Sequence, residues 1–136
     1  MKIVLLADQR KYELLNNFCI AYKQILCQQE LSSQFNLSRQ IAEACAIPVE
    51  TLTSDRFAQI EQLALKANYN EVDAIIYLRD PLLEDSEERS SFDQLARACD
   101  LNAIPYATNL ATAEILILAI ERGDLDWRHL LRNEQR

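Results

Sequence analysis

IPYATNLATAE, residues 104–114, places a short apolar run before a small polar turn and a long apolar segment. The run predicts a buried strand, and the segment, which Gly123 closes as a C-cap, predicts a helix. In an open α/β sheet, ligands bind outside the carboxyl ends of strands, where helix N-termini favour anions. Thr108 and Asn109 lie at this position. Both are also preferred helix caps, so a cap and a ligand site remain alternatives.

Strand and helix patterns alternate about five times along the chain. Buried strands are predicted at residues 3–7, 74–78 and 104–107, and a weakly alternating strand at residues 49–53. Helices are predicted at residues 11–28, 37–45, 55–64, 92–99 and 110–120. Polar loops are expected at residues 30–36, with a short strand before them as an alternative, and at 84–88. The tail, residues 126–131, should form a short helix on the body or on a neighbouring subunit. The alternation implies a mostly parallel sheet with right-handed crossovers.

The composition indicates one globular domain over residues 1–136, with 49% hydrophobic and 26% charged residues. A net charge of −7 argues against nucleic-acid or anionic-membrane binding through a basic field. The apolar run 115–120 is too short to span a bilayer, and the apolar start reaches Asp8 too early for a secretory signal. We therefore expect a cytoplasmic protein.

Metal and cofactor binding are not expected from the cysteine and histidine pattern. The chain has one histidine, His129, and no Cys-x-x-Cys pair. The four cysteines occupy apolar helical phases and are expected to be buried, reduced thiols: Cys19, Cys27, Cys45 and Cys99.

Several polar residues follow predicted strands and should meet at one rim of the sheet. Pro81 keeps Asp80 out of a helix, so that its carboxylate lies at the mouth of its strand. Two strand-end carboxylates can exchange protons beside a carbonyl, and a serine-rich loop can hold a phosphate. Ordinary turn and cap roles are the alternative for all of them. The strand-end residues are Asp8, the loop from Ser32 to Asn36, Ser54, Asp55, Asp80, Thr108 and Asn109. Arg10, Lys11, Arg39 and Arg79 are either anion-binding residues or surface charges.

Three stretches in the right order, residues 6–8, 78–82 and 104–114, resemble the methylglyoxal synthase family. The resemblance covers nearly the whole chain. It implies a three-layer αβα fold, flavodoxin-like, with a five-stranded parallel sheet, and a homo-oligomer, generally a hexamer. It also implies conversion of dihydroxyacetone phosphate to methylglyoxal and phosphate. The same domain type is a regulatory, ligand-binding unit in carbamoyl phosphate synthetase.

The chain departs from the family at several motifs. Asp8, Lys11 and Asp80 match the family. The family's Ala-His-Asp element lacks its histidine here, and the family's further catalytic histidine, which should lie near Glu87, is also missing. The family's Gly-Thr-Thr-Gly phosphate loop should fall within residues 31–38, which contain no glycine. The family's catalytic base, an aspartate, is replaced by Gln59 or Ile60, depending on a one-residue gap.

Three hypotheses follow from this comparison. The first is a catalytically degenerate, regulatory relative that binds a small phosphorylated or anionic ligand and acts through assembly or a partner protein. The second is an active synthase in which Asp8 or Asp80 supplies the base. The third is a ligand-free, partner-binding protein whose pocket is closed by Phe35 or Phe57. The expected ligand-binding residues are Lys11, Ser32, Ser33, Asn36, Ser38, Ser54, Asp55, Thr108 and Asn109.

Overall fold

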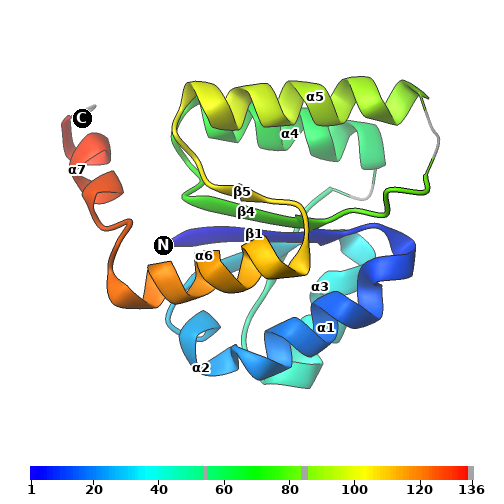
Figure 1. Ribbon diagram of the computed structural model, residues 1–136, viewed down its shortest axis with the longest axis horizontal. Coiled ribbons are helices and arrows are strands. Elements are labelled where there is room, and N and C mark those ends of the chain that lie inside the picture. Colours follow the sequence, from blue (N-terminus) through cyan, green and yellow to red (C-terminus); the bar gives the residue numbers. More distant parts are fainter. Residues whose placement is uncertain (54, 84–85, 135–136) are drawn as a thin grey trace.

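The computed structural model describes residues 1–53, 55–83 and 86–134 of the chain, with only the backbone described at 56–57, 86–91 and 131–134. Strands and helices alternate along it (Figure 1). The strands are β1 (Lys2–Ala7), β2 (Glu30–Ser33), β3 (Glu50–Thr51), β4 (Ala74–Leu78) and β5 (Tyr106–Ala107). The helices are the short 3₁₀ turn η1 (Gln9–Lys11), α1 (Tyr12–Ala21), α2 (Lys23–Leu26), α3 (Phe35–Cys45), α4 (Arg56–Asn68), α5 (Ser86–Leu101), α6 (Leu110–Arg122) and α7 (Trp127–Glu134).

The five strands form one parallel sheet in the order β3-β2-β1-β4-β5. Helices α4 and α5 cover one face, and α1, α2, α3 and α6 cover the other (Figure 1). Strands β1 and β4 are continuous apolar runs because both of their faces are buried. The expected α/β class, flavodoxin-like in its three layers, is confirmed.

The strand order reverses between β1 and β4. From β1 the chain moves outward to β2 and β3, then crosses to the opposite side of β1 to add β4 and β5. The register pairs Ala7 with Leu78, so the two strands end side by side. The carboxyl ends of neighbouring strands at such a reversal are the usual binding crevice of this class of fold.

The predicted elements are present, but several of their boundaries differ. Strands β3 and β5 are two residues long, shorter than the predicted 49–53 and 104–107. The predicted helix over residues 11–28 is interrupted at Tyr22, which has a non-helical ψ of 21°. Ser32 and Ser33 lie in strand β2 rather than in a loop, because they pair with Val4 and Leu5 of β1. In the expected acidic loop, Glu84 and Asp85 lie outside the described residues, and α5 already begins at Ser86.

Helix α6 has the expected ends. The Asn109 side chain caps its start, and Gly123 adopts a left-handed conformation (φ 81°) at its end. Within the described residues, no helix has both the length and the apolar character needed to cross a membrane.

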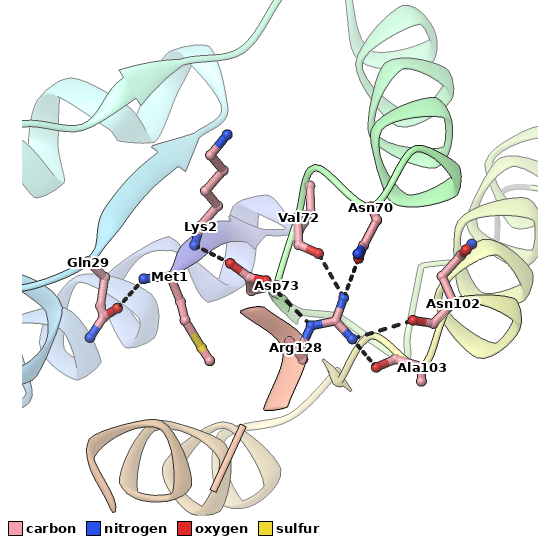
Figure 2. A network of polar contacts seen from close by, with 9 residues as sticks. All are labelled: Met1, Lys2, Gln29, Asn70, Val72, Asp73, Asn102, Ala103 and Arg128. Carbon is pink, nitrogen blue, oxygen red and sulfur yellow. Dashed lines mark hydrogen bonds and ion pairs between the residues drawn. The ribbon is translucent and has the colours of Figure 1, made fainter. Parts of the chain in front are cut away.

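The C-terminal helix α7 is present where the sequence predicted a short helix, and a charged residue attaches it to the body. Trp127 and Leu130 remain exposed, whereas Arg128 is fully buried. The Arg128 guanidinium meets Asp73 at 3.4 Å and Asn70 Oδ1 at 2.8 Å, and donates to the carbonyls of residues 72, 102 and 103 (Figure 2). These acceptors follow α4 and α5, whose C-terminal ends favour a cation.

Three of the four cysteines are buried as expected, but Cys27 is exposed. Burial raises the pKa of the Cys19 thiol to about 12 and that of Cys99 to about 11, and it also raises the pKa of Cys45. The thiolate is the reactive form, so these three thiols should react slowly at pH 8. Cys27 lies just after the short helix α2, where its side chain reaches solvent.

We expect one thiol of the folded protein to react rapidly with an aromatic disulfide reagent at pH 8, and four after unfolding. The reaction is followed by absorbance of the released thiolate. Cys27→Ser should remove the fast phase and leave the slow ones. A second fast thiol in that variant would contradict the burial of the other three.

Candidate functional site

Two aspartates lie at the adjacent carboxyl ends of the central strands. Asp8 follows β1 directly, and Asp80 lies two residues beyond the end of β4. Both are buried, at 3% and 7% exposure. They therefore occupy the point where the strand order reverses.

Both carboxylate oxygens of Asp8 accept a hydrogen bond. The Tyr77 hydroxyl donates to Oδ1 at 2.8 Å, and the backbone N–H of Asp80 donates to Oδ2 at 2.7 Å. The Asp8 backbone N–H in turn donates to the Leu78 carbonyl at 3.0 Å. Asp8 thus joins the end of β1 to the turn after β4.

Asp80 is bonded through only one of its two oxygens. Its Oδ1 accepts the backbone N–H of Leu82 at 2.9 Å, which fixes the turn around Pro81. Its Oδ2 is buried and accepts no hydrogen bond from the described residues, although Arg10 Nε lies 3.5 Å away. The Arg10 side chain is 71% exposed, so this ion pair reaches solvent on one side.

A pocket of about 610 Å³ opens beside these aspartates, and we call it the larger pocket. It brings together five of the residues expected at the site: Asp8, Lys11, Asp80, Thr108 and Asn109. Arg79, Pro81, Leu83, Phe92 and Asp93 complete its lining.

Asn109 is a helix cap that also lines the larger pocket. Its Oδ1 accepts hydrogen bonds from the Thr112 backbone N–H at 3.0 Å and from the Thr112 hydroxyl at 3.1 Å. The Thr108 carbonyl accepts the Arg79 backbone N–H at 3.2 Å. Asn109 is therefore a helix cap, and its place in the lining leaves the predicted ligand role open to test.

A second pocket of about 310 Å³, the smaller pocket, lies on the other side of Asp8. Its lining holds Asn36, Gln34 and Gln59, together with Phe35 and Ile60, and no lysine or arginine among the described residues. Gln34 is engaged on both sides, since it accepts the Ala7 N–H and donates to the Tyr12 hydroxyl.

Phe35 lines the smaller pocket without closing it, since its side chain is 62% exposed. The side chain of Phe57, the other residue expected to close the pocket, lies outside the described part of the chain. Gln59 Nε2 donates to the Thr53 carbonyl at 3.2 Å, so this amide is also engaged within the protein.

Two hydroxyls of the predicted serine-rich phosphate site are engaged within the protein. The Ser33 hydroxyl donates to the Leu5 carbonyl at 2.6 Å, and the Ser38 hydroxyl pairs with Thr51 at 2.7 Å. Ser32 lines a separate cavity of about 130 Å³ beside Lys2 and Glu30, near the amino ends of β1 and β2.

Of the two residues expected before α4, only Asp55 is described, and it does not line the larger pocket. Asp55 accepts the Ala58 backbone N–H at 3.3 Å, which is a helix-cap role, and Ser54 lies outside the described residues. Neither of the two pockets beside Asp8 includes Asp55 in its lining.

An aromatic cluster behind the larger pocket was not anticipated from the sequence. The Phe92 ring packs edge-on against Tyr77, with centroids 5.0 Å apart, and the Arg79 guanidinium lies 4.3 Å from the Phe92 centroid. Tyr106 packs nearby, and its buried hydroxyl bonds to no described residue. One feature of the sequence could have indicated this cluster. Tyr77 lies in an otherwise aliphatic buried strand, and a buried tyrosine hydroxyl needs a hydrogen-bond partner.

The described residues offer no group of three or more His, Cys, Asp and Glu side chains able to hold a metal ion. His129 lies on the C-terminal helix α7 and lines neither of the pockets beside Asp8.

The sequence is similar to curated proteins over almost its full length. It is 40% identical over 131 residues to a methylglyoxal synthase of Caldicellulosiruptor saccharolyticus, covering 96% of this chain and 92% of that protein. It is 38% identical over 135 residues to a methylglyoxal synthase of Listeria welshimeri, covering 99% and 100% of the two chains. No family model matches the sequence.

The fold is similar to a crystal structure of methylglyoxal synthase from Elizabethkingia anophelis. The TM-score is 0.72 at 20% identity, with 85% of this chain and 76% of that chain covered. At this identity the structural match concerns the fold alone.

Proposed function

Since the chain belongs to the methylglyoxal synthase family, we propose that it is an active synthase that converts dihydroxyacetone phosphate to methylglyoxal and phosphate. The observation that carries this proposal is Asp80 Oδ2. It is a buried carboxylate oxygen with no hydrogen-bond donor among the described residues, in a residue that lines the larger pocket. A general base needs such an open lone pair within reach of the substrate.

In the proposed reaction, Asp80 removes a proton from the hydroxymethyl carbon beside the ketone. The electron pair forms an enediolate, whose collapse breaks the carbon–oxygen bond to phosphate. The resulting enol takes up a proton at the terminal carbon and gives methylglyoxal. Lys11, which lines the same pocket, supplies positive charge near the developing enediolate oxygen. Asp8 holds the turn that carries Asp80, because it accepts the Asp80 backbone N–H.

A binding-only, regulatory role is the second candidate, and a specific observation favours it. Gln59, one of the two positions where the family resemblance places the base, is an amide already donating to the Thr53 carbonyl. The hydroxyls of Ser33 and Ser38 are likewise engaged within the protein. In this alternative the larger pocket holds a phosphorylated ligand without turning it over.

Turnover of dihydroxyacetone phosphate by the purified protein separates the two candidates. Methylglyoxal and inorganic phosphate should appear in equal amounts, at a rate within the ordinary enzymatic range of about 1–10³ per second. Phosphate binding without methylglyoxal formation would reject the active synthase in favour of the binding-only role. If the protein shows neither turnover nor phosphate binding, the remaining hypothesis is a partner-binding protein that has no ligand.

The proposal includes a cytoplasmic homo-oligomer. Support for assembly comes from apolar side chains that stay exposed on two helices, Ile115 and Leu118 on α6 and Trp127 and Leu130 on α7. Such groups of exposed apolar residues are typical of surfaces that bind another protein chain.

A further inference from the structure

The basic residues at the larger pocket differ in whether a carboxylate already forms an ion pair with them. Arg10, which lies next to the pocket, faces Asp80 Oδ2 at 3.5 Å. Arg79 and Lys11 line the pocket, and neither forms an ion pair with a carboxylate of the described residues. Among the described residues, these two positive charges have no carboxylate partner, although Asp8, Asp80 and Asp93 line the same pocket.

Arg79 is held in place at both ends. Its guanidinium stacks on the Phe92 ring at 4.3 Å, and Phe92 is itself buried and packed against Tyr77. Its backbone N–H donates to the Thr108 carbonyl at 3.2 Å, which ties it to the turn before α6. Stacking on an aromatic face leaves the edge of the guanidinium, where its N–H donors point, open to an anion.

The Tyr106 hydroxyl lies in the same electrostatic environment. Burial raises the pKa of Tyr106 to about 12, while the nearby charge of Arg79 lowers it and those of Asp8 and Asp93 raise it. All three of these charged residues line the larger pocket. The hydroxyl is buried and has no hydrogen-bond partner among the described residues, but Tyr106 does not itself line the larger pocket.

The smaller pocket offers an anion fewer positive charges and fewer free hydrogen-bond donors among the described residues. Its described lining has no lysine or arginine, and its neighbouring serines donate to Leu5 or pair with Thr51. Positive charge in the crevice is thus concentrated after β4 and β1, not after β2 where the serine-rich segment lies.

We propose that Arg79 is the principal anion-binding residue of the larger pocket, that Phe92 positions it, and that the ligand class is a phosphomonoester or inorganic phosphate. The planar guanidinium can donate two parallel hydrogen bonds to phosphate oxygens, and Lys11 adds a second charge from the β1 side. The phosphoryl subsite of this chain then lies beside β4 and β5. If the proposed synthase activity also holds, this arrangement puts the phosphoryl group next to the carboxylate of Asp80.

The test is calorimetric titration of the purified protein with inorganic phosphate and with glycerol 3-phosphate, an unreactive phosphomonoester. Arg79→Gln should raise both dissociation constants by roughly 10- to 100-fold, since a hydrogen bond to a charged group is lost. Arg79→Lys should bind with intermediate affinity, because it keeps the charge without the planar donors. Phe92→Leu should weaken binding by a smaller factor while keeping the apolar volume. Arg39→Gln removes an exposed charge that pairs with Glu43 on α3, and it should bind like the wild type.

Equal affinity of wild type and Arg79→Gln, or no heat with either probe, would overturn the proposal. Circular dichroism identifies any variant that fails to fold, and in that event Arg79→Lys and Phe92→Leu decide the outcome. Asp80→Asn separates this proposal from the synthase activity, since it should lower turnover by roughly 10²- to 10⁴-fold while phosphate binding still depends on Arg79. Phosphate binding that depends on Arg79 in a protein without turnover would uphold the subsite and reject the synthase.

Discussion

Replacing Arg128 by methionine should lower the free energy of unfolding by about 3–5 kcal/mol. The variant leaves the Asp73 carboxylate, which is fully buried, without its cation. It also removes the donor that reaches the Asn70 side chain and the carbonyls at the ends of α4 and α5. Removing one partner of a buried ion pair costs far more than the pair contributes, because the remaining charge stays out of water. Urea denaturation followed by circular dichroism measures the change.

Arg122→Met is the matched control. Arg122 pairs with Asp124 at 2.9 Å, but both side chains are about half exposed or more, so its loss should cost less than about 1 kcal/mol. Adding Asp73→Asn to Arg128→Met removes the buried negative charge and should recover part of the stability. A loss below about 1 kcal/mol for Arg128→Met alone would show that the contacts in Figure 2 do not hold α7 to the body.

The sequence carried enough information for the layers of the fold but not for this attachment. Apolar runs without alternation mark β1 and β4 as central strands, and Asn109 and Gly123 mark the ends of α6. An arginine is by default a surface residue, so nothing in the local pattern predicts that Arg128 is buried. Its acceptors come from two helix ends about 25 and 55 residues away along the chain, which only the tertiary structure brings together.

In the candidate site, too, the sequence pattern predicts some positions, and only the tertiary structure shows the others. Pro81 and the position after a strand were sufficient to place Asp80 at the sheet rim, and the chain order placed Asp8 beside it. The serines were assigned by residue type alone. Whether a hydroxyl faces a ligand or a backbone carbonyl depends on strand register, and Ser33 is directed to Leu5 by its place in β2. The stacking of Arg79 on Phe92 joins residues on two elements and has no sequence signature.

Asp80→Asn should reduce turnover of dihydroxyacetone phosphate by roughly 10²- to 10⁴-fold, the usual contribution of a general base. The amide keeps the size of the side chain and can still accept the Leu82 N–H through its oxygen, so the turn at Pro81 should persist. What disappears is the basic oxygen at Oδ2, since an amide nitrogen there cannot take a proton. Initial rates of methylglyoxal formation at saturating substrate measure the effect, because a base acts in the chemical step and lowers kcat rather than raising KM.

Asp93→Asn makes the same chemical change in the same pocket and serves as the control. Asp93 lines the larger pocket but is exposed, so its carboxylate is solvated. Removing its charge should shift kcat by less than about tenfold, because a solvent-screened carboxylate contributes little to the field at the reacting carbon. If Asp80→Asn kept more than about a tenth of the wild-type kcat, Asp80 would fall short of the contribution of a general base. Asp8 would not replace it readily, since both of its oxygens already accept hydrogen bonds from Tyr77 and Asp80. The base would then have to come from a carboxylate outside the β1–β4 crevice.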